Sequence, residues 1–262
     1  FNPKVYQIWK NQLDTLVQNC LETHPMDTSA LKFAGAWYYG TGREDRGLEY
    51  YDQWLELCPD SPGPHFVKMS LLIANKEWDS VIEEADRMAV LFRDDLETLV
   101  SVLCTKGDAY SAKKQRSKAF KCYEQALSID PENIMTLNNY AYYLSQKGER
   151  LDEAEEMSYH TIKAEPDNKT YLDTYAWILF CKKEYTEARI YIDRVVSPEA
   201  TDEAILADSL LTGALIEHAG DIYSMCGLSD EALRLWKLAL RKKDDTVTAL
   251  LPKKIRHKKY KK

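Results

Sequence analysis

Apolar residues recur along most of this chain at spacings of three and four, the pattern of helices that bury one face. Residues 1–27 predict one such helix, with Pro3 in its first turn. The longest purely apolar run, Tyr175 to Cys181, has seven residues and is far shorter than the ~20 needed to cross a bilayer. Only 10 glycines and 9 prolines are present, too few for the many turns of a sandwich or barrel. The pattern therefore predicts an all-α protein.

Proline divides the helical pattern into repeats. Pro25 and Pro59 lie 34 residues apart, Pro131 and Pro166 lie 35 apart, and each closes an apolar, helix-periodic stretch. Proline cannot continue a helix, and the residue before it avoids the helical region, so each proline ends a helix pair. The interval from Pro59 to Pro131 leaves room for one more unit that lacks the closing proline.

Residues 100–133 show the clearest spacing of large and small side chains. Its marked positions are Leu103, Gly107 and Tyr110 on a first helix and Ala119, Tyr123, Ala126 and Pro131 on a second. This pattern resembles the tetratricopeptide repeat, in which small residues at the eighth and twentieth places let helices approach closely. Bulky residues at the eleventh and twenty-fourth places fill the space between helix pairs.

The same frame, laid along the chain, gives six units: 28–61, 62–95, 100–133, 134–168, 169–202 and 213–246. The eighth places hold Gly35, Met69, Gly107, Ala141, Ala176 and Gly220, and the twentieth hold Gly47, Val81, Ala119, Ala154, Ala188 and Ala232. Five of six are small at each place, and unit 62–95 is the exception. The resemblance implies a right-handed superhelical solenoid of about six stacked helix–turn–helix repeats, bacterial in style.

Both ends of the array depart from this frame. Residues 1–27 match the second half of a preceding repeat, as expected of a fragment or processed form of a longer array. Ten extra residues before unit 213–246 predict a long helix from Thr201 to Met225, with Gly213 and Gly220 inside it. Residues 247–262 are expected to form a basic C-terminal tail.

Charge is distributed unevenly along the chain. The net charge of −7 combines +8 over residues 241–262 with −15 over the rest. The acidic part repels phosphate backbones, whereas the basic end has three interpretations: a poorly ordered tail, an anchor for nucleic acid or an anionic surface, or a clasp onto the acidic body. Its candidate residues are Lys253, Lys254, Arg256, Lys258 and Lys259.

The resemblance also implies a concave groove lined by first helices, where extended peptides or helices bind. The groove places carry Asn138, Asn139 and Tyr142 in the fourth unit, Asp173, Thr174, Trp177 and Phe180 in the fifth, and Glu217, His218 and Asp221 in the sixth. Asn139 occupies the place where the family often holds a ligand backbone, although the Asn138–Asn139 pair also suits a bridge between helices. Trp177 and Phe180 suit either an aromatic shelf in the groove or the core. Tyr140, Tyr175 and Trp236 are expected in the core.

Enzyme signatures are weak. The six cysteines form no Cys-x-x-Cys motif, the five histidines no i, i+4 pair, and Gly40–Gly47 has the wrong spacing for a phosphate loop. Cys104, Cys122 and Cys181 suit buried thiols. We therefore expect a protein that is not an enzyme and uses no metal or cofactor.

These observations predict a non-catalytic scaffold or adaptor that binds another protein, with a basic or amphipathic segment as the ligand of its acidic, aromatic groove. Two alternatives stay open: nucleic-acid or anionic-surface binding through residues 241–262, and self-association by end-to-end stacking of copies. The chain is expected to be soluble, either cytoplasmic or processed and exported to the cell envelope. The partner, the compartment and the oligomeric state are left open.

Overall fold

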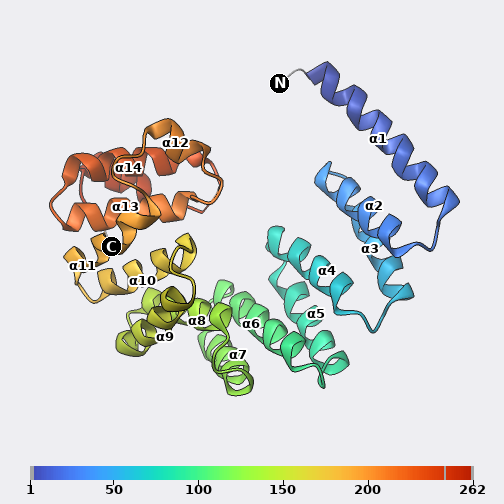
Figure 1. Ribbon diagram of the computed structural model, residues 1–262, viewed down its shortest axis with the longest axis horizontal. Coiled ribbons are helices and arrows are strands. Elements are labelled where there is room, and N and C mark those ends of the chain that lie inside the picture. The colour runs from blue at the N-terminus through green and yellow to red at the C-terminus, as the bar shows by residue number, and fades with distance from the viewer. Residues whose placement is uncertain (1–2, 245, 261–262) are drawn as a thin grey trace. The chain divides into compact units, whose positions relative to one another are not determined.

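The computed structural model describes residues 3–244 and 246–260, and this part of the chain consists of fifteen α-helices without a strand (Figure 1). The predicted all-α fold is confirmed. The chain divides into two compact units, Phe1–Ile129 and Asp130–Lys262. The first unit contains α1 (Pro3–Thr23), α2 (Thr28–Gly40), α3 (Glu44–Leu57), α4 (Pro62–Ala74), α5 (Trp78–Leu91), α6 (Leu96–Ala112) and α7 (Arg116–Ile129). The second contains α8 (Ile134–Lys147), α9 (Leu151–Ala164), α10 (Lys169–Cys181), α11 (Tyr185–Val195), α12 (Asp202–Ala207), α13 (Gly213–Met225), α14 (Ser229–Lys242) and α15 (Leu251–His257).

Consecutive helices pack in pairs within each unit (Figure 1). In the first unit α2 packs on α3, α4 on α5 and α6 on α7, and in the second α8 packs on α9, α10 on α11 and α13 on α14. The helical-repeat solenoid expected from the spacing is therefore present. The four residues between the second and third predicted units add one turn to the start of α6, which begins at Leu96.

Glycine at the eighth place lies directly under the aromatic ring of the twenty-fourth place. A Cβ added to Gly35 would lie 2.7 Å from Tyr51 Cζ, and one added to Gly107 would lie 2.6 Å from Tyr123 Cε1. Real carbon atoms do not approach this closely, so the two helices of these pairs can meet only at glycine.

Side-chain caps fix where several first helices begin. Asp27 accepts a hydrogen bond from the Ala30 N–H at 2.8 Å, and Asp95 accepts one from Thr98 at 3.1 Å. Asn168 caps α10 in the same way, accepting from Tyr171 at 3.3 Å. Such caps satisfy backbone N–H groups that have no partner inside the helix.

The turns between paired helices require left-handed backbone, and lysine supplies it three times. Lys76, Lys114 and Lys183 have φ values of 60°, 59° and 70° in the turns of their pairs. Gly42 occupies this position in the first pair with φ of 76°, in the turn between α2 and α3. Each left-handed lysine stores backbone strain that glycine would not have.

The exceptional unit, 62–95, packs with larger residues. Met69 and Val81 stand where the other units have small residues, and they are 1% and 0% exposed. Next to them the buried pair His65 and Glu84 forms a hydrogen bond through His65 Nδ1. The edge of the Phe92 ring covers the imidazole, with 5.6 Å between ring centroids.

A large hydrophobic cluster holds helices α10 to α15 of the second unit together. The predicted core positions are confirmed, since Tyr140, Tyr175 and Trp236 are all buried. Among the cysteines expected to be buried, Cys104 and Cys122 are buried and Cys181 is half-buried.

The predicted long helix from Thr201 to Met225 is wrong. The chain forms the short α12, leaves the helix at Asp208 and begins α13 at Gly213. Asp208 accepts the Leu210 N–H at 2.8 Å, and Thr212 caps α13 by accepting the Leu215 N–H at 3.3 Å. The local side-chain bonds make a helix end and a helix start more favourable than continuation. Gly213 is accordingly the first residue of α13 and not an interior one.

The interpretation of residues 247–262 as a poorly ordered tail is also wrong over the part that is described. Residues Leu251–His257 form α15, with Pro252 in its first turn. Leu251 is 0% exposed and Lys254 is 2% exposed. This helix packs on α14 and belongs to the second unit.

Candidate functional site

Two carboxylates on one face of α13 hold the ammonium group of Lys254. Glu217 and Asp221 are four residues apart and therefore point the same way from the helix. Lys254 Nζ donates to Glu217 Oε1 at 2.7 Å and to Asp221 Oδ2 at 2.5 Å. All three side chains are at least 97% buried. Of the three interpretations of the basic end, the structure therefore shows for Lys254 the contact with the acidic body of the chain.

The chain that carries Lys254 follows α13 from its first residues to its last turn. We call residues 246–260 the C-terminal segment. The Thr246 hydroxyl accepts the Ala214 N–H at 2.8 Å, the Thr248 N–H donates to Glu217 Oε2 at 2.7 Å, and the Tyr260 N–H donates to Ser224 Oγ at 3.1 Å. The segment and α13 therefore run in the same direction.

The other carboxylate oxygen of Asp221 is bound by a residue of α14, the helix paired with α13. Trp236 Nε1 on α14 donates to Asp221 Oδ1 at 2.9 Å, while Lys254 occupies the other oxygen. Burial raises the pKa of Asp221 from the ordinary 3.8 to about 6, although the nearby ammonium of Lys254 acts in the opposite direction.

A second buried ion pair lies beside the first. His218 Nδ1 donates to Asp173 Oδ2 on α10 at 2.9 Å, and both side chains are more than 90% buried. Burial alone would lower the pKa of His218, but the charge and hydrogen bond of Asp173 outweigh burial and, with Asp221 and Glu217, raise it. The arrangement favours an imidazolium.

Aromatic rings surround these charges. Trp177 stacks on the His218 ring with 4.0 Å between centroids, and Phe180 stacks on Trp177 at 4.8 Å. The Tyr260 ring meets Phe180 edge to face at 5.1 Å and lies 5.4 Å from Lys254 Nζ. Phe180 is buried and Trp177 half-buried in the cluster, so both are part of the core as well as of this site.

Of the other predicted groove residues on α8 and α10, Tyr142 contacts this site. Tyr142 is half-buried, 6.2 Å from the His218 ring, and burial together with Asp173 raises its pKa to about 12. Asn138 Nδ2 donates to Asn139 Oδ1 at 3.2 Å, while Asn138 Oδ1 is buried without a hydrogen-bond partner. Thr174 is buried. Tyr142 of the fourth predicted unit and Asp173 and Trp177 of the fifth therefore lie around His218 of the sixth.

The remaining predicted basic residues do not join the site. Lys253, Arg256, Lys258 and Lys259 are exposed, whereas Lys254 alone of the five is buried. The sequence carries no local signal that distinguishes Lys254 from Lys253. The opposite charges of the chain's acidic body and basic end are the signal that indicated such a contact.

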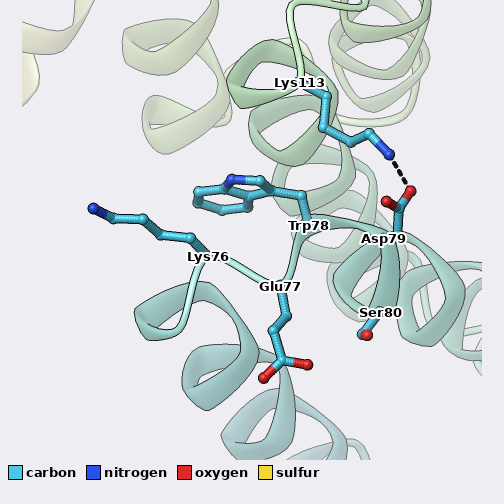
Figure 2. Close-up of a pocket in the computed structure, with 6 residues that line it drawn as sticks. All are labelled: Lys76, Glu77, Trp78, Asp79, Ser80 and Lys113. Carbon is cyan, nitrogen blue, oxygen red and sulfur yellow. Dashed lines mark hydrogen bonds and ion pairs between the residues drawn. The ribbon is translucent and has the colours of Figure 1, made fainter.

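The first unit carries a shallow surface hollow of about 260 Å³ between the α4–α5 turn and the end of α6 (Figure 2). Lys113 reaches across it to pair with Asp79, and Trp78 forms one wall (Figure 2). Lys113 and Asp79 therefore already neutralise each other at this hollow.

Among the described residues, no group of three or more His, Cys, Asp or Glu side chains could hold a metal ion. Within the same residues no helix is both long and apolar enough to span a bilayer.

Comparison with known sequences places the repeat in a family. Two profiles, each described as tetratricopeptide repeat, match residues 100–133 and 122–156. No curated protein matches the chain.

Solved structures of similar fold span nearly the whole chain. A tetratricopeptide repeat protein from Parabacteroides merdae has a TM-score of 0.70 at 14% identity, covering 97% of this chain and 94% of that one. PilF of Pseudomonas aeruginosa has a TM-score of 0.60 at 16% identity, covering 88% and 97%. The Cut9–Hcn1 structure of the APC/C has a TM-score of 0.69 at 10% identity, covering 95% of this chain and 46% of that one. At these identities the likeness concerns the fold.

Proposed function

We propose that this chain, as a tetratricopeptide-repeat protein, binds a segment of another protein. The proposed binding surface consists of the side chains of α8, α10 and α13 that surround His218. Tetratricopeptide repeats generally mediate protein–protein interactions and do so without chemistry of their own. The proposed role is therefore binding by a preformed surface.

One observation carries this proposal: the buried carboxylates of Glu217 and Asp221 hold an ammonium group beside a row of stacked rings. Carboxylates select a cation, and aromatic faces supply contact area at low entropic cost. A basic or amphipathic segment fits this chemistry.

The test is selection of random peptides of about 15 residues on the full-length protein, followed by affinity measurements with two variants. Tyr142→Ala removes a half-buried ring beside His218, whereas Tyr159→Ala removes an exposed ring on α9. We expect the selected peptides to lose about tenfold or more in affinity for Tyr142→Ala, about 1.4 kcal/mol, and nothing for Tyr159→Ala. Equal affinity for both variants would place the binding surface elsewhere. Melting temperatures check that both variants are folded.

A second function rests on the exposure of Lys253, Arg256, Lys258 and Lys259. Such a row of cations can bind nucleic acid or an anionic surface. The test is retention on heparin across a salt series with Lys253, Lys258 and Lys259 changed to glutamate. The matched control changes three other exposed lysines, namely Lys121, Lys163 and Lys237. Salt-sensitive retention that is lost only in the tail variant supports this function, and equal retention of both variants contradicts it.

A further inference from the structure

The C-terminal segment is attached to the second unit by a buried ion pair, by hydrogen bonds and by four residues in or against the hydrophobic cluster. Its helix α15 has seven residues, most of whose side chains are exposed. Leu251 and Lys254 are its buried side chains. Val247 and Ile255 pack against the hydrophobic cluster. Further attachments are the hydrogen bonds of Thr246, Thr248 and Tyr260 described above and the ring contact of Tyr260 with Phe180.

A buried ion pair of this kind contributes little net stability, because desolvation of the charges offsets most of their attraction. Removal of only the cation is nevertheless costly, since Glu217 and Asp221 would then stay buried without a counter-charge. Dissociation of the segment without a substitute is therefore costly, whereas its exchange for another segment with an ammonium group is not. A second ammonium group in the same place satisfies both carboxylates.

We propose that residues 246–260 are an internal ligand, which a partner segment of the same chemistry displaces from the side chains around Glu217 and Asp221. The inference rests on the proposed function and specifies its ligand. Thr248, Lys254 and Tyr260, spaced six residues apart, make the contacts, and the Thr248 hydroxyl donates to Glu217 Oε1. The partner segment presents a lysine, a hydroxyl residue six positions before it and an aromatic residue six positions after it, and it runs parallel to α13.

Tethering keeps the site closed in the resting protein. A short connection holds the internal ligand at an effective concentration on the order of millimolar, so a free segment of equal intrinsic affinity competes poorly. Weakening the internal ligand alone should therefore open the site to a free peptide.

The experiment uses a labelled synthetic peptide with the sequence of residues 246–260 and the full-length protein near pH 8. Lys254→Met removes the internal ammonium at nearly constant side-chain length. Lys253→Met is the matched control, because Lys253 is the exposed neighbour on the same helix. We expect the peptide to bind Lys254→Met at least about tenfold more tightly than wild type or Lys253→Met. A peptide that carries methionine at the Lys254 position should lose that gain.

Tyr260→Ala gives an independent route, because it weakens the far end of the segment and leaves both carboxylates paired. It too should bind the peptide more tightly than wild type, and it decides the question if Lys254→Met does not fold. A second readout is hydrogen exchange: excess peptide should accelerate exchange of the backbone amides of α15, which a permanent structural cap would not do.

Equal peptide affinity of wild type, Lys254→Met, Lys253→Met and Tyr260→Ala would overturn the inference. So would equal binding of the lysine and methionine peptides to Lys254→Met. Library-selected peptides distinguish this failure from that of the proposed function. If they bind wild type and Lys254→Met equally and still depend on Tyr142, the proposed function stands without displacement. If no peptide depends on Tyr142, the proposed function itself is wrong.

Discussion

Gly220 shows how much one residue controls in this fold. An added Cβ would lie 2.5 Å from Trp236 Cδ1 and 3.2 Å from the Ala232 carbonyl oxygen. The repeat spacing predicted a small residue here and a large one sixteen positions later. It did not predict that the Trp236 indole N–H would bind Asp221, because that bond depends on the rotamers of two side chains on different helices.

Gly220→Ala is expected to destabilise the protein by about 1–3 kcal/mol, since the methyl group overpacks the contact between α13 and α14. Gly40→Ala is the control, because Gly40 ends α2 with nothing within 4 Å of an added Cβ. That change should be neutral or stabilise by up to about 1 kcal/mol. Urea denaturation at an unchanged m value measures both. A Gly220→Ala protein as stable as Gly40→Ala would contradict the packing argument.

Asp221 also predicts a pH dependence at the scale of single residues. Its pKa is about 6 in the folded protein, above the ordinary 3.8. Between these two pH values the folded protein keeps the Asp221 proton, whereas the unfolded chain has released it. Its contribution to stability is therefore largest at the acid end and declines as the pH rises through about 6.

Lys254→Met should exaggerate this dependence. The ammonium lowers the pKa of Asp221, so its removal raises that pKa further. Near pH 5 the carboxylate protonates easily and we expect a small loss of stability, whereas near pH 8 the loss should approach about 3–5 kcal/mol. Urea titrations at both pH values measure the difference, with Lys253→Met as the control. The same loss at both pH values would mean that Asp221 does not sense Lys254.

At the scale of elements, the start of α13 depends on a connection that comes after α14. Asp244 accepts the Gly213 N–H at 2.7 Å, and Thr246 accepts the Ala214 N–H at 2.8 Å. Helix boundaries capped by nearby residues, such as the Asp27 cap of α2, are visible in the sequence. The boundary at Gly213 is only partly visible, because the local Thr212 cap is joined by two capping groups that lie about thirty residues away. This is why the sequence pattern predicted a helix running through it.

Asp244→Ala is expected to cost about 0.5–2 kcal/mol, the usual cost of losing a cap. It should also increase hydrogen exchange in the first turn of α13, because the Gly213 N–H loses its acceptor. Asp94→Ala is the matched control, since the Asp94 side chain is 91% exposed and paired only with its neighbour Arg93 among the described contacts. Equal stability of the two variants would show that the cap contributes nothing.

At the scale of the whole molecule, helix pairs were predictable because each repeat contacts mainly its neighbours, so a local pattern determines them. The site was only partly predictable. The places of Glu217, His218 and Asp221 in the repeat frame predicted them as groove residues. The contact of Lys254 with Glu217 and Asp221 is long-range, and the repeat spacing does not predict it. The division into two units at Ile129 is likewise absent from the spacing.

A graded stability along the array follows. On α1, Ile8, Trp9 and Leu16 are each 58–60% exposed, whereas α10 lies in the large cluster of the second unit. We expect backbone amides in α1 to exchange at least about tenfold faster than those in α10, because local opening exposes little further apolar surface there. Hydrogen–deuterium exchange with peptide-level mass spectrometry measures this. Equal protection of α1 and α10 would contradict the gradient.

The left-handed lysines in the turns have a consequence for how this fold can be stabilised. Lys76, Lys114 and Lys183 each hold a backbone conformation that costs an L-residue roughly 1–2 kcal/mol relative to glycine. Glycine would adopt the same backbone conformation without this cost. These three equivalent turns are therefore positions at which glycine would stabilise the fold without altering the helices that the turns join.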